Sequence, residues 1–259
     1  MNSPRPLDKT ATNSQANTRT LVLTGASRGI GHATVKKFSA GGWRVITVSR
    51  QPFSALCPWP AGGENHVQLD LADPVDIGRG IEQIRARLKG AGVDALVNNA
   101  AISPKSASGG RLGAIDTPFD LWRQVFNVNF FAPVALARGL IDELSRARGA
   151  VVNVTSIAGS RVHPFAGSAY ATSKAALAAL TREMAQDFGP RGIRVNAIAP
   201  GEIDTTILSP GTEKIVENQI PMRRLGTPDE VADVIHFLCE KGASYVSGAE
   251  IQINGGQHV

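Results

Sequence analysis

The sequence has few cysteines and no long apolar run. It contains 2 cysteines, Cys57 and Cys239, which stand far apart and form no Cys-x-x-Cys pair. This usage favours a reducing compartment over a secreted scaffold that depends on disulfides. No stretch approaches the roughly 20 apolar residues of a membrane span, and the N-terminal residues lack the apolar segment of a signal peptide. We therefore expect a cytoplasmic protein without a membrane partner.

Charge clusters and groups of metal ligands are also scarce. The net charge of +5 arises from 27 basic and 22 acidic residues that are scattered along the chain. No basic stripe of the kind that binds nucleic acid is present, and no His, Cys, Asp or Glu residues have metal-ligand spacing. We predict neither a nucleic-acid partner nor a metal.

The chain does contain an alternation of strand-like and helix-like segments. Short apolar runs occur at residues 20–24, 44–49, 66–69, 95–98, 151–155, 194–199 and 250–253. Helical patterns lie between them at residues 30–40, 75–88, 119–146, 169–188 and 229–240. This alternation predicts an α/β fold, a Rossmann-type doubly wound parallel sheet of about seven strands with helices on both faces. The polar residues 1–18 are expected to be a disordered extension, and residues 19–259 a single domain.

A glycine-rich turn follows the first predicted strand. Gly25, Gly29 and Gly31 have the spacing Gly-x-x-x-Gly-x-Gly, and a helix is predicted to begin among them. The start of a helix presents unpaired N–H groups and a positive dipole end, which suit the pyrophosphate of a dinucleotide. Gly25 would make the turn, Gly29 would let the backbone approach the phosphates, and Gly31 would let the helix pack closely. The alternative is an ordinary strand–turn–helix without a ligand.

The end of the second predicted strand bears on the choice of dinucleotide. It reads Val48-Ser49-Arg50, with no acidic residue. A carboxylate there would accept hydrogen bonds from the ribose of NAD, whereas an arginine can pair with the 2′-phosphate of NADP. Arg28, inside the glycine turn, is a second cation. NADP(H) is therefore favoured, with NAD(H) as the alternative, unless both arginines are simply solvated.

A tyrosine and a lysine stand four residues apart in the predicted helix 169–188. Tyr170 and Lys174 share a helix face, and a nearby ammonium would lower the tyrosine pKa. Tyr170 could then exchange a proton with a substrate oxygen near neutral pH. Ser156 follows the fifth predicted strand, where its hydroxyl could bond the same oxygen. The alternatives are a core tyrosine, a solvated lysine and a structural serine.

Taken together, these residues resemble the short-chain dehydrogenase/reductase family in its compact single-domain branch. The resemblance covers residues 20–256. Its motifs occur in order as Thr24-Gly25-x-x-x-Gly29-x-Gly31, Asp70, Asn98-Asn99-Ala100, Asn129, Ser156, Tyr170-x-x-x-Lys174 and Pro200-Gly201-x-x-x-Thr205. One position differs, because the family usually has glycine where this chain has Ala101. A methyl group there would slightly change how the cofactor sits.

The resemblance implies an NAD(P)(H)-dependent oxidoreductase that transfers hydride between the nicotinamide and a carbonyl or alcohol carbon. It makes Tyr170 the acid/base and Ser156 the residue that positions the substrate oxygen. Lys174 would lower the tyrosine pKa and hold the nicotinamide ribose, and Asn129 would anchor a water in a proton relay. Asp70, taken alone, is equally a turn cap. The implied cofactor-binding residues are Gly25, Ser27, Arg28, Gly29, Ile30, Gly31, Ser49, Arg50, Asp70, Leu71, Asn99, Ala100, Tyr170, Lys174, Pro200, Gly201, Ile203 and Thr205.

The substrate is expected to be a small carbonyl or alcohol compound, and three activities stay open. NADPH-dependent reduction of a ketone or 3-oxoacyl thioester is favoured over an alcohol, sugar or steroid dehydrogenase and over a non-catalytic dinucleotide sensor. Arg191 matches a residue that docks acyl carrier protein in the 3-oxoacyl group, but the partner position is Ala147, so this partner is less favoured. The resemblance also implies a homo-oligomer, either a dimer or a tetramer.

Three segments are expected to shape the substrate pocket. They are a flexible loop at residues 103–113, the stretch 161–165, and a lid at residues 207–222 with Pro210-Gly211 as its hinge. His163 in the second segment is either a substrate contact or a structural histidine.

Overall fold

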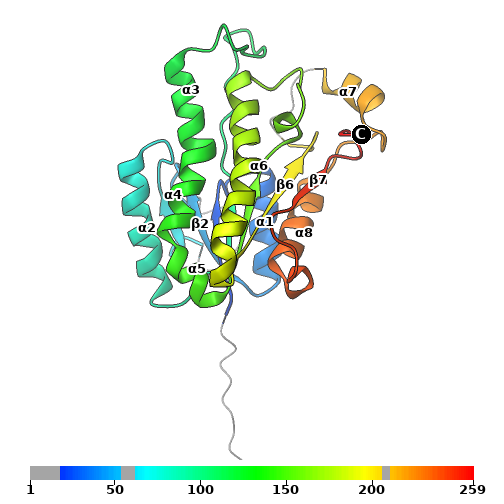
Figure 1. Cartoon of the computed structure of the whole chain (residues 1–259). Coiled ribbons are helices and arrows are strands. Elements are labelled where there is room, and N and C mark those ends of the chain that lie inside the picture. Colours follow the sequence, from blue (N-terminus) through cyan, green and yellow to red (C-terminus); the bar gives the residue numbers. More distant parts are fainter. Residues whose placement is uncertain (1–17, 54–61, 206–210) are drawn as a thin grey trace, which may run out of the picture.

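Seven parallel strands form the centre of the protein, as a computed structural model shows (Figure 1). The model describes residues 18–53, 62–205 and 211–259. The strand order is β3-β2-β1-β4-β5-β6-β7, which confirms the predicted Rossmann-type sheet. The strands are β1 Thr20–Thr24, β2 Arg44–Ser49, β3 His66–Gln68, β4 Ala95–Asn98, β5 Ala150–Val154, β6 Arg194–Pro200 and β7 Glu250–Ile253.

Helices cover both faces of the sheet. On one face, Val35 and Phe38 of α1 (Gly29–Ala40) share a buried core with Ile235 of α8 (Pro228–Cys239). On the other face, a second core joins α2 (Pro74–Leu88), α4 (Ala132–Gly139) and α6 (Ser168–Phe188). Because both faces are covered, the central strands are buried along their whole length, as the near-continuous apolar runs predict.

The helical pattern predicted over residues 119–146 is helical in the structure, but it is not one uninterrupted α-helix. The structure has α3 (Phe119–Phe126), a π turn (Asn127–Phe131), α4, and α5 (Ile141–Ala147) in its place. In the π turn, the Ala132 N–H donates to the carbonyl of Asn127, five residues earlier. Pro133 has no N–H and cannot bond the Asn129 carbonyl in the α-helical pattern. Its position accounts for the wider turn, a feature that often lies at functional sites.

One helix was not predicted. The helix α7 (Thr212–Gln219) occupies half of the segment 207–222 that is expected to act as a lid. Gly211, at its start, has a φ of 91°, a conformation that glycine adopts easily. Residues 207–210 of the expected lid, including Pro210 of its hinge, lie outside the described residues, as do residues 1–17 of the predicted N-terminal extension. The described residues also contain the 3₁₀ turns η2 Ile157–Gly159, η3 Gly189–Arg191 and η4 Lys241–Ala243. No helix in the described ranges is long and apolar enough to cross a membrane.

Candidate active site

A cavity of about 650 Å³ opens where the parallel strands end at their carboxyl termini. Sheets of this type bind their ligands at that edge. Most of the residues predicted from the sequence line it together: Gly25, Ser27, Arg28, Gly29, Ile30, Ser49, Arg50, Leu71, Asn99, Ala100, Ser156, Tyr170, Lys174, Pro200, Gly201, Ile203 and Thr205. Three predicted residues, Gly31, Asp70 and Asn129, are not among its lining residues.

The glycine turn has the shape that a phosphate cradle requires. Gly25 has a φ of +72° and donates its N–H to the carbonyl of Val48. A Cβ on Gly31 would lie 2.0 Å from the carbonyl oxygen of Gly25, so no side chain fits there. Gly31 therefore lets helix α1 pack against the turn, whereas Gly29 faces the cavity and Thr205. Helix α1 also starts without a side-chain cap or an acidic residue in its first turn. Its N–H groups suit a phosphate anion.

Asn99 holds the glycine turn in place. Its Nδ2 donates to the carbonyls of Thr24 and Gly25 at 3.1 and 2.9 Å. The hydroxyl of Thr24 in turn accepts the N–H groups of Asn99 and Ala100. These hydrogen bonds connect the carboxyl ends of β1 and β4. These contacts use the Asn99 amide to fix the loops that form the wall of the cavity.

Asp70 caps a turn in this structure. Its Oδ1 accepts the N–H of Ala72 at 2.9 Å, and its own N–H donates to Oδ2 of Asp76. The side chain is exposed outside the cavity lining, while the next residue, Leu71, lies inside it. A cofactor contact by the Asp70 side chain stays a prediction.

Tyr170, Lys174 and Ser156 meet at the wall of the cavity. Lys174 is 1% exposed, and its Nζ donates to the carbonyl of Val154 at 2.6 Å. The same Nζ lies 5.8 Å from the centroid of the Tyr170 ring. Ser156 hydrogen-bonds the Tyr170 side chain. The predicted trio is therefore brought together by the end of β5 and the first two turns of α6.

The lowering of the Tyr170 pKa by Lys174 stays a prediction, because burial dominates the net shift in this structure. Burial raises the pKa of Tyr170, the hydrogen bond from Ser156 lowers it, and the charge of Glu202 raises it, with a net upward shift. Burial also lowers the pKa of Lys174 from 10.5 to about 7. Burial therefore disfavours the charged form of both groups, the phenolate of Tyr170 and the ammonium of Lys174. Sequence spacing showed the pairing, but it could not show the desolvation of both groups.

Asn129 lies beneath the site instead of inside the cavity. The side chain is fully buried, with Oδ1 accepting the N–H of Ile102 and Nδ2 donating to the Ile102 carbonyl. Nδ2 also donates to Ser173, whose hydroxyl bonds the carbonyl of Tyr170. Asn129 therefore ties helix α6 to the loop that follows β4. A water relay at this residue stays a prediction.

A buried histidine–carboxylate pair lines the same cavity and was not predicted as a unit. His163 Nε2 lies 2.6 Å from Oε1 of Glu202, and the two side chains are only 10% and 11% exposed. Lys105 lies near Glu202 and donates to the carbonyl of Phe165. One sequence signal could have identified Glu202. It directly follows Pro200-Gly201 at the carboxyl end of a buried strand, where side chains face the ligand-binding edge of the sheet.

The loop predicted to be flexible is tied to the segment before α6. Besides Lys105, Arg111 donates to the carbonyl of Ala166 at 2.8 Å. The N–H of Ser168, the first residue of α6, donates to the carbonyl of Leu112 at 2.9 Å. These bonds fix one wall of the cavity.

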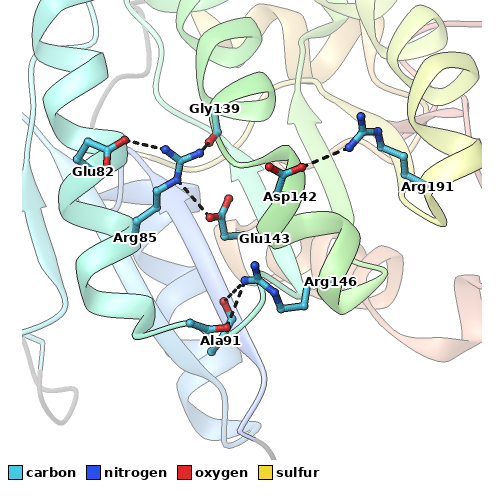
Figure 2. Close-up of polar contacts among 9 residues, drawn as sticks. Glu82, Arg85, Ala91, Gly139, Asp142, Glu143, Arg146 and Arg191 are labelled. Atoms are coloured by element: carbon cyan, nitrogen blue, oxygen red, sulfur yellow. Dashed lines mark hydrogen bonds and ion pairs between the residues drawn. The ribbon is translucent and has the colours of Figure 1, made fainter.

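Arg191, the residue considered for docking acyl carrier protein, pairs with a carboxylate of the same chain, and other arginines nearby are also engaged within the chain (Figure 2). Arg191 lies 3.4 Å from Asp142, and Arg146 donates to the carbonyls of Gly90 and Ala91. Arg85 in the same region bonds Glu143 and two further oxygens. These segments precede β5 and β6, so they lie at the edge of the sheet opposite the cavity. The geometry gives no support for that docking surface within one subunit.

Comparison with known proteins places the chain in a family. A family model described as enoyl-(acyl carrier protein) reductase matches residues 25–258. The chain belongs to the short-chain dehydrogenase/reductase family, and it is an oxidoreductase that acts on carbonyl or alcohol groups with NAD(P). It is 61% identical over 242 residues to Protein FixR of Bradyrhizobium diazoefficiens, a match covering 93% of this chain and 87% of that protein.

Two further relatives are informative about fold and cofactor. A short-chain dehydrogenase/reductase from Brucella ovis, solved in complex with a partially ordered NAD, is 63% identical with a TM-score of 0.80. That match covers 92% of this chain and all of the other. A 3-oxoacyl-[acyl-carrier-protein] reductase from Aquifex aeolicus is 33% identical over 249 residues, or 91% of this chain and 95% of that protein.

Proposed function

We propose that the protein reduces a ketone or aldehyde of a small molecule, with NADPH as the preferred reductant. The observation that carries this proposal is the meeting of Ser156, Tyr170 and Lys174 in a cavity that also contains the glycine turn at the start of α1. A dinucleotide sensor would need the glycine turn alone. The raised pKa of Tyr170 keeps its phenol protonated at neutral pH, which is the form that a reductase needs before turnover.

The roles of the residues follow from the contacts. The nicotinamide, when bound, supplies the hydride. As the substrate carbon receives it, negative charge develops on the carbonyl oxygen, and the hydroxyls of Ser156 and Tyr170 stabilise that charge. Tyr170 gives its proton to this oxygen, so the product is an alcohol. Lys174, bonded to the Val154 carbonyl, is placed beside the phenol and can stabilise the phenolate until a solvent proton replaces the one transferred.

The preference for NADPH rests on two arginines. Arg28 and Arg50 both line the cavity and are exposed, and no acidic residue ends β2. Both can reach toward the adenosine end of a dinucleotide whose phosphates sit at the start of α1. NADH is the alternative reductant, because the Brucella ovis relative was solved with NAD bound.

Replacing Arg50 by aspartate should reverse the cofactor preference. We expect the Kd for NADPH to rise by about tenfold or more, while the Kd for NADH stays unchanged or falls, because one favourable charge pair becomes repulsive. Fluorescence titration of both cofactors measures the ratio. Arg182→Asp, at an exposed position of α6 outside the cavity, makes the same charge change and should leave the ratio as it is. An unchanged ratio in Arg50→Asp would show that Arg50 does not contact the 2′-phosphate.

The proposed activity is tested by adding substrates to the protein with saturating NADPH or NADH. The panel contains simple ketones, a 3-oxoacyl thioester and several alcohols. Loss of NADPH absorbance that depends on a carbonyl compound supports the reductase. Turnover of alcohols alone would favour a dehydrogenase, and tight binding without any turnover would favour a sensor.

We also propose a homo-oligomer that forms through the outer helices. A chain of ring contacts runs from Trp122 through Phe126 and Phe130 to Phe131. Phe119 and Phe131 on this side are 83% and 54% exposed. Aromatic side chains left exposed in this number are typical of a subunit interface. The cytoplasmic location stays a prediction from the use of cysteine.

A further inference from the structure

A group of charged side chains lies in the part of the cavity formed by the loops after β4, β5 and β6. We call it the polar subsite and define it as Lys105, His163 and Glu202. These residues are not part of the Ser156, Tyr170 and Lys174 arrangement. A carboxylate with an 11% exposed side chain is costly to bury unless hydrogen bonds compensate it.

His163 supplies one of those hydrogen bonds and orients the carboxylate. The N–H of Phe165 donates to Nδ1 of His163, so Nδ1 is an acceptor and the ring proton is on Nε2. Nε2 then donates to Oε1 of Glu202 at 2.6 Å. A neutral histidine is sufficient for this arrangement. Glu202 is held as an acceptor, with its side chain fixed against the cavity wall.

The second oxygen of Glu202 has no hydrogen-bond donor in the part of the chain that the structure describes. The charge of Lys105 interacts with that of Glu202, but the Nζ of Lys105 donates its hydrogen bond to the Phe165 carbonyl. The charge of Glu202 in turn reaches the phenol of Tyr170 and contributes to its raised pKa. An acceptor oxygen is therefore available in the cavity that Ser156 and Tyr170 also line, where a bound ligand would desolvate it.

We propose that Glu202, held by His163, is a specificity-determining residue that accepts a hydrogen bond from an amino or hydroxyl group near the reacting carbonyl of the substrate. The preferred substrates are then compact amino ketones or hydroxy ketones. This inference rests on the proposed carbonyl reduction. An apolar acyl chain in the same place would leave the carboxylate desolvated without a donor, which disfavours 3-oxoacyl thioesters.

Three ketones of nearly the same shape test the proposal. Aminoacetone, hydroxyacetone and butanone share the skeleton CH3–CO–CH2–X. They differ only in X, which is an amino, a hydroxyl or a methyl group, respectively. We expect kcat/KM for aminoacetone to exceed that for butanone by about tenfold or more, as one charge-assisted hydrogen bond allows. In Glu202→Gln the ratio of kcat/KM for aminoacetone to kcat/KM for butanone should fall to near one, whatever the absolute rates of the variant. Equal discrimination in both proteins would overturn the proposal.

A binding measurement separates recognition from turnover. Glycinamide and propanamide are shaped like aminoacetone and butanone, but their amide groups are not reduced. Calorimetry on the protein with bound NADPH should show at least about tenfold tighter binding of glycinamide, lost in Glu202→Gln. Asp204→Asn is the matched control, because Asp204 is exposed on the same loop and lies outside the cavity lining.

The outcomes distinguish the two proposals. If the wild type and Glu202→Gln reduce all three ketones with the same relative rates, the proposed role of the polar subsite is overturned and the proposed reductase activity stands. Binding of glycinamide that depends on Glu202, without turnover of any ketone, would support the subsite and overturn the reductase. Thermal unfolding of Glu202→Gln excludes a folding defect, since glutamine keeps an acceptor for His163.

Discussion

Tyr170→Phe should lower kcat by about a hundredfold or more and leave the Kd for NADPH close to that of the wild type. The phenylalanine ring keeps the packing at the start of α6, and only the hydroxyl that bonds Ser156 is removed. Without it, no group can give the substrate oxygen its proton, whereas the glycine turn at the start of α1 is unaffected. Single-turnover kinetics and fluorescence titration measure the two quantities separately.

The chain contains a convenient control for this substitution. Tyr245 is the second of its 2 tyrosines and is fully exposed. Tyr245→Phe should therefore leave both kcat and cofactor binding unchanged. Turnover of Tyr170→Phe at the wild-type rate would contradict the role of Tyr170 as the proton donor.

Lys174→Met should abolish most of the activity and yet stabilise the cofactor-free protein at low pH. Lys174 is buried, and its pKa of about 7 reflects the cost of keeping its charge out of water. Methionine has a similar length and no charge. We expect a gain in the free energy of unfolding on the order of 1–3 kcal/mol near about pH 6, net of the hydrogen bond lost by the Val154 carbonyl. The loss in kcat should again be about a hundredfold or more.

The sign of the pH dependence follows from the two pKa values of the lysine. Below pH 7 the wild-type lysine is charged in both the folded and unfolded states, so the full penalty of burial applies. Between about 7 and 10.5 the unfolded state binds more protons, and the stability of the wild type rises with pH. The advantage of Lys174→Met should therefore shrink across this window. Denaturant unfolding at several pH values measures it, with Lys36→Met on the exposed face of α1 as the control.

A stability difference that does not vary with pH would contradict this account. So would a less stable Lys174→Met protein near about pH 6, which would mean that the Val154 hydrogen bond outweighs the buried charge. Either result would still be compatible with a catalytic role for Lys174, because the activity measurement is separate.

Local patterns in the sequence were sufficient to predict the sheet, the glycine turn and the Tyr170–Lys174 pair, whereas most of the remaining cavity lining was implied by the family resemblance. Buried parallel strands are apolar on both faces, so each appears as a short run, and the glycines at 25, 29 and 31 follow the first of these runs in a spacing that suits a phosphate-binding turn. Tyr170 and Lys174 are one helical turn apart, and their proximity follows from helix geometry. These features depend on residues that are close in sequence.

Features that depend on tertiary contacts were not predicted. His163 and Glu202 are 39 residues apart and meet only because the loops after β5 and β6 lie side by side. The upward shift of the Tyr170 pKa depends on how deeply α6 is packed, which spacing does not show. The break in the helix over residues 119–146 was readable in part, since Pro133 is visible in the sequence, but its result was a π turn and not an end of the helix.

The strand order also determines how the chain can fold. The central strand β1 pairs with β4, so Val22 must meet Leu96, and none of these parallel pairs can be closed by a short turn. Such non-local pairing is slow, because the entropy of closing a long loop is lost before the contacts compensate it. A nascent chain that ends before β6 would leave the apolar strand β5 as an unprotected edge, which invites pairing with a second chain. The interval between the completion of β5 and the emergence of β6 is therefore one stage of synthesis at which the chain is open to intermolecular pairing.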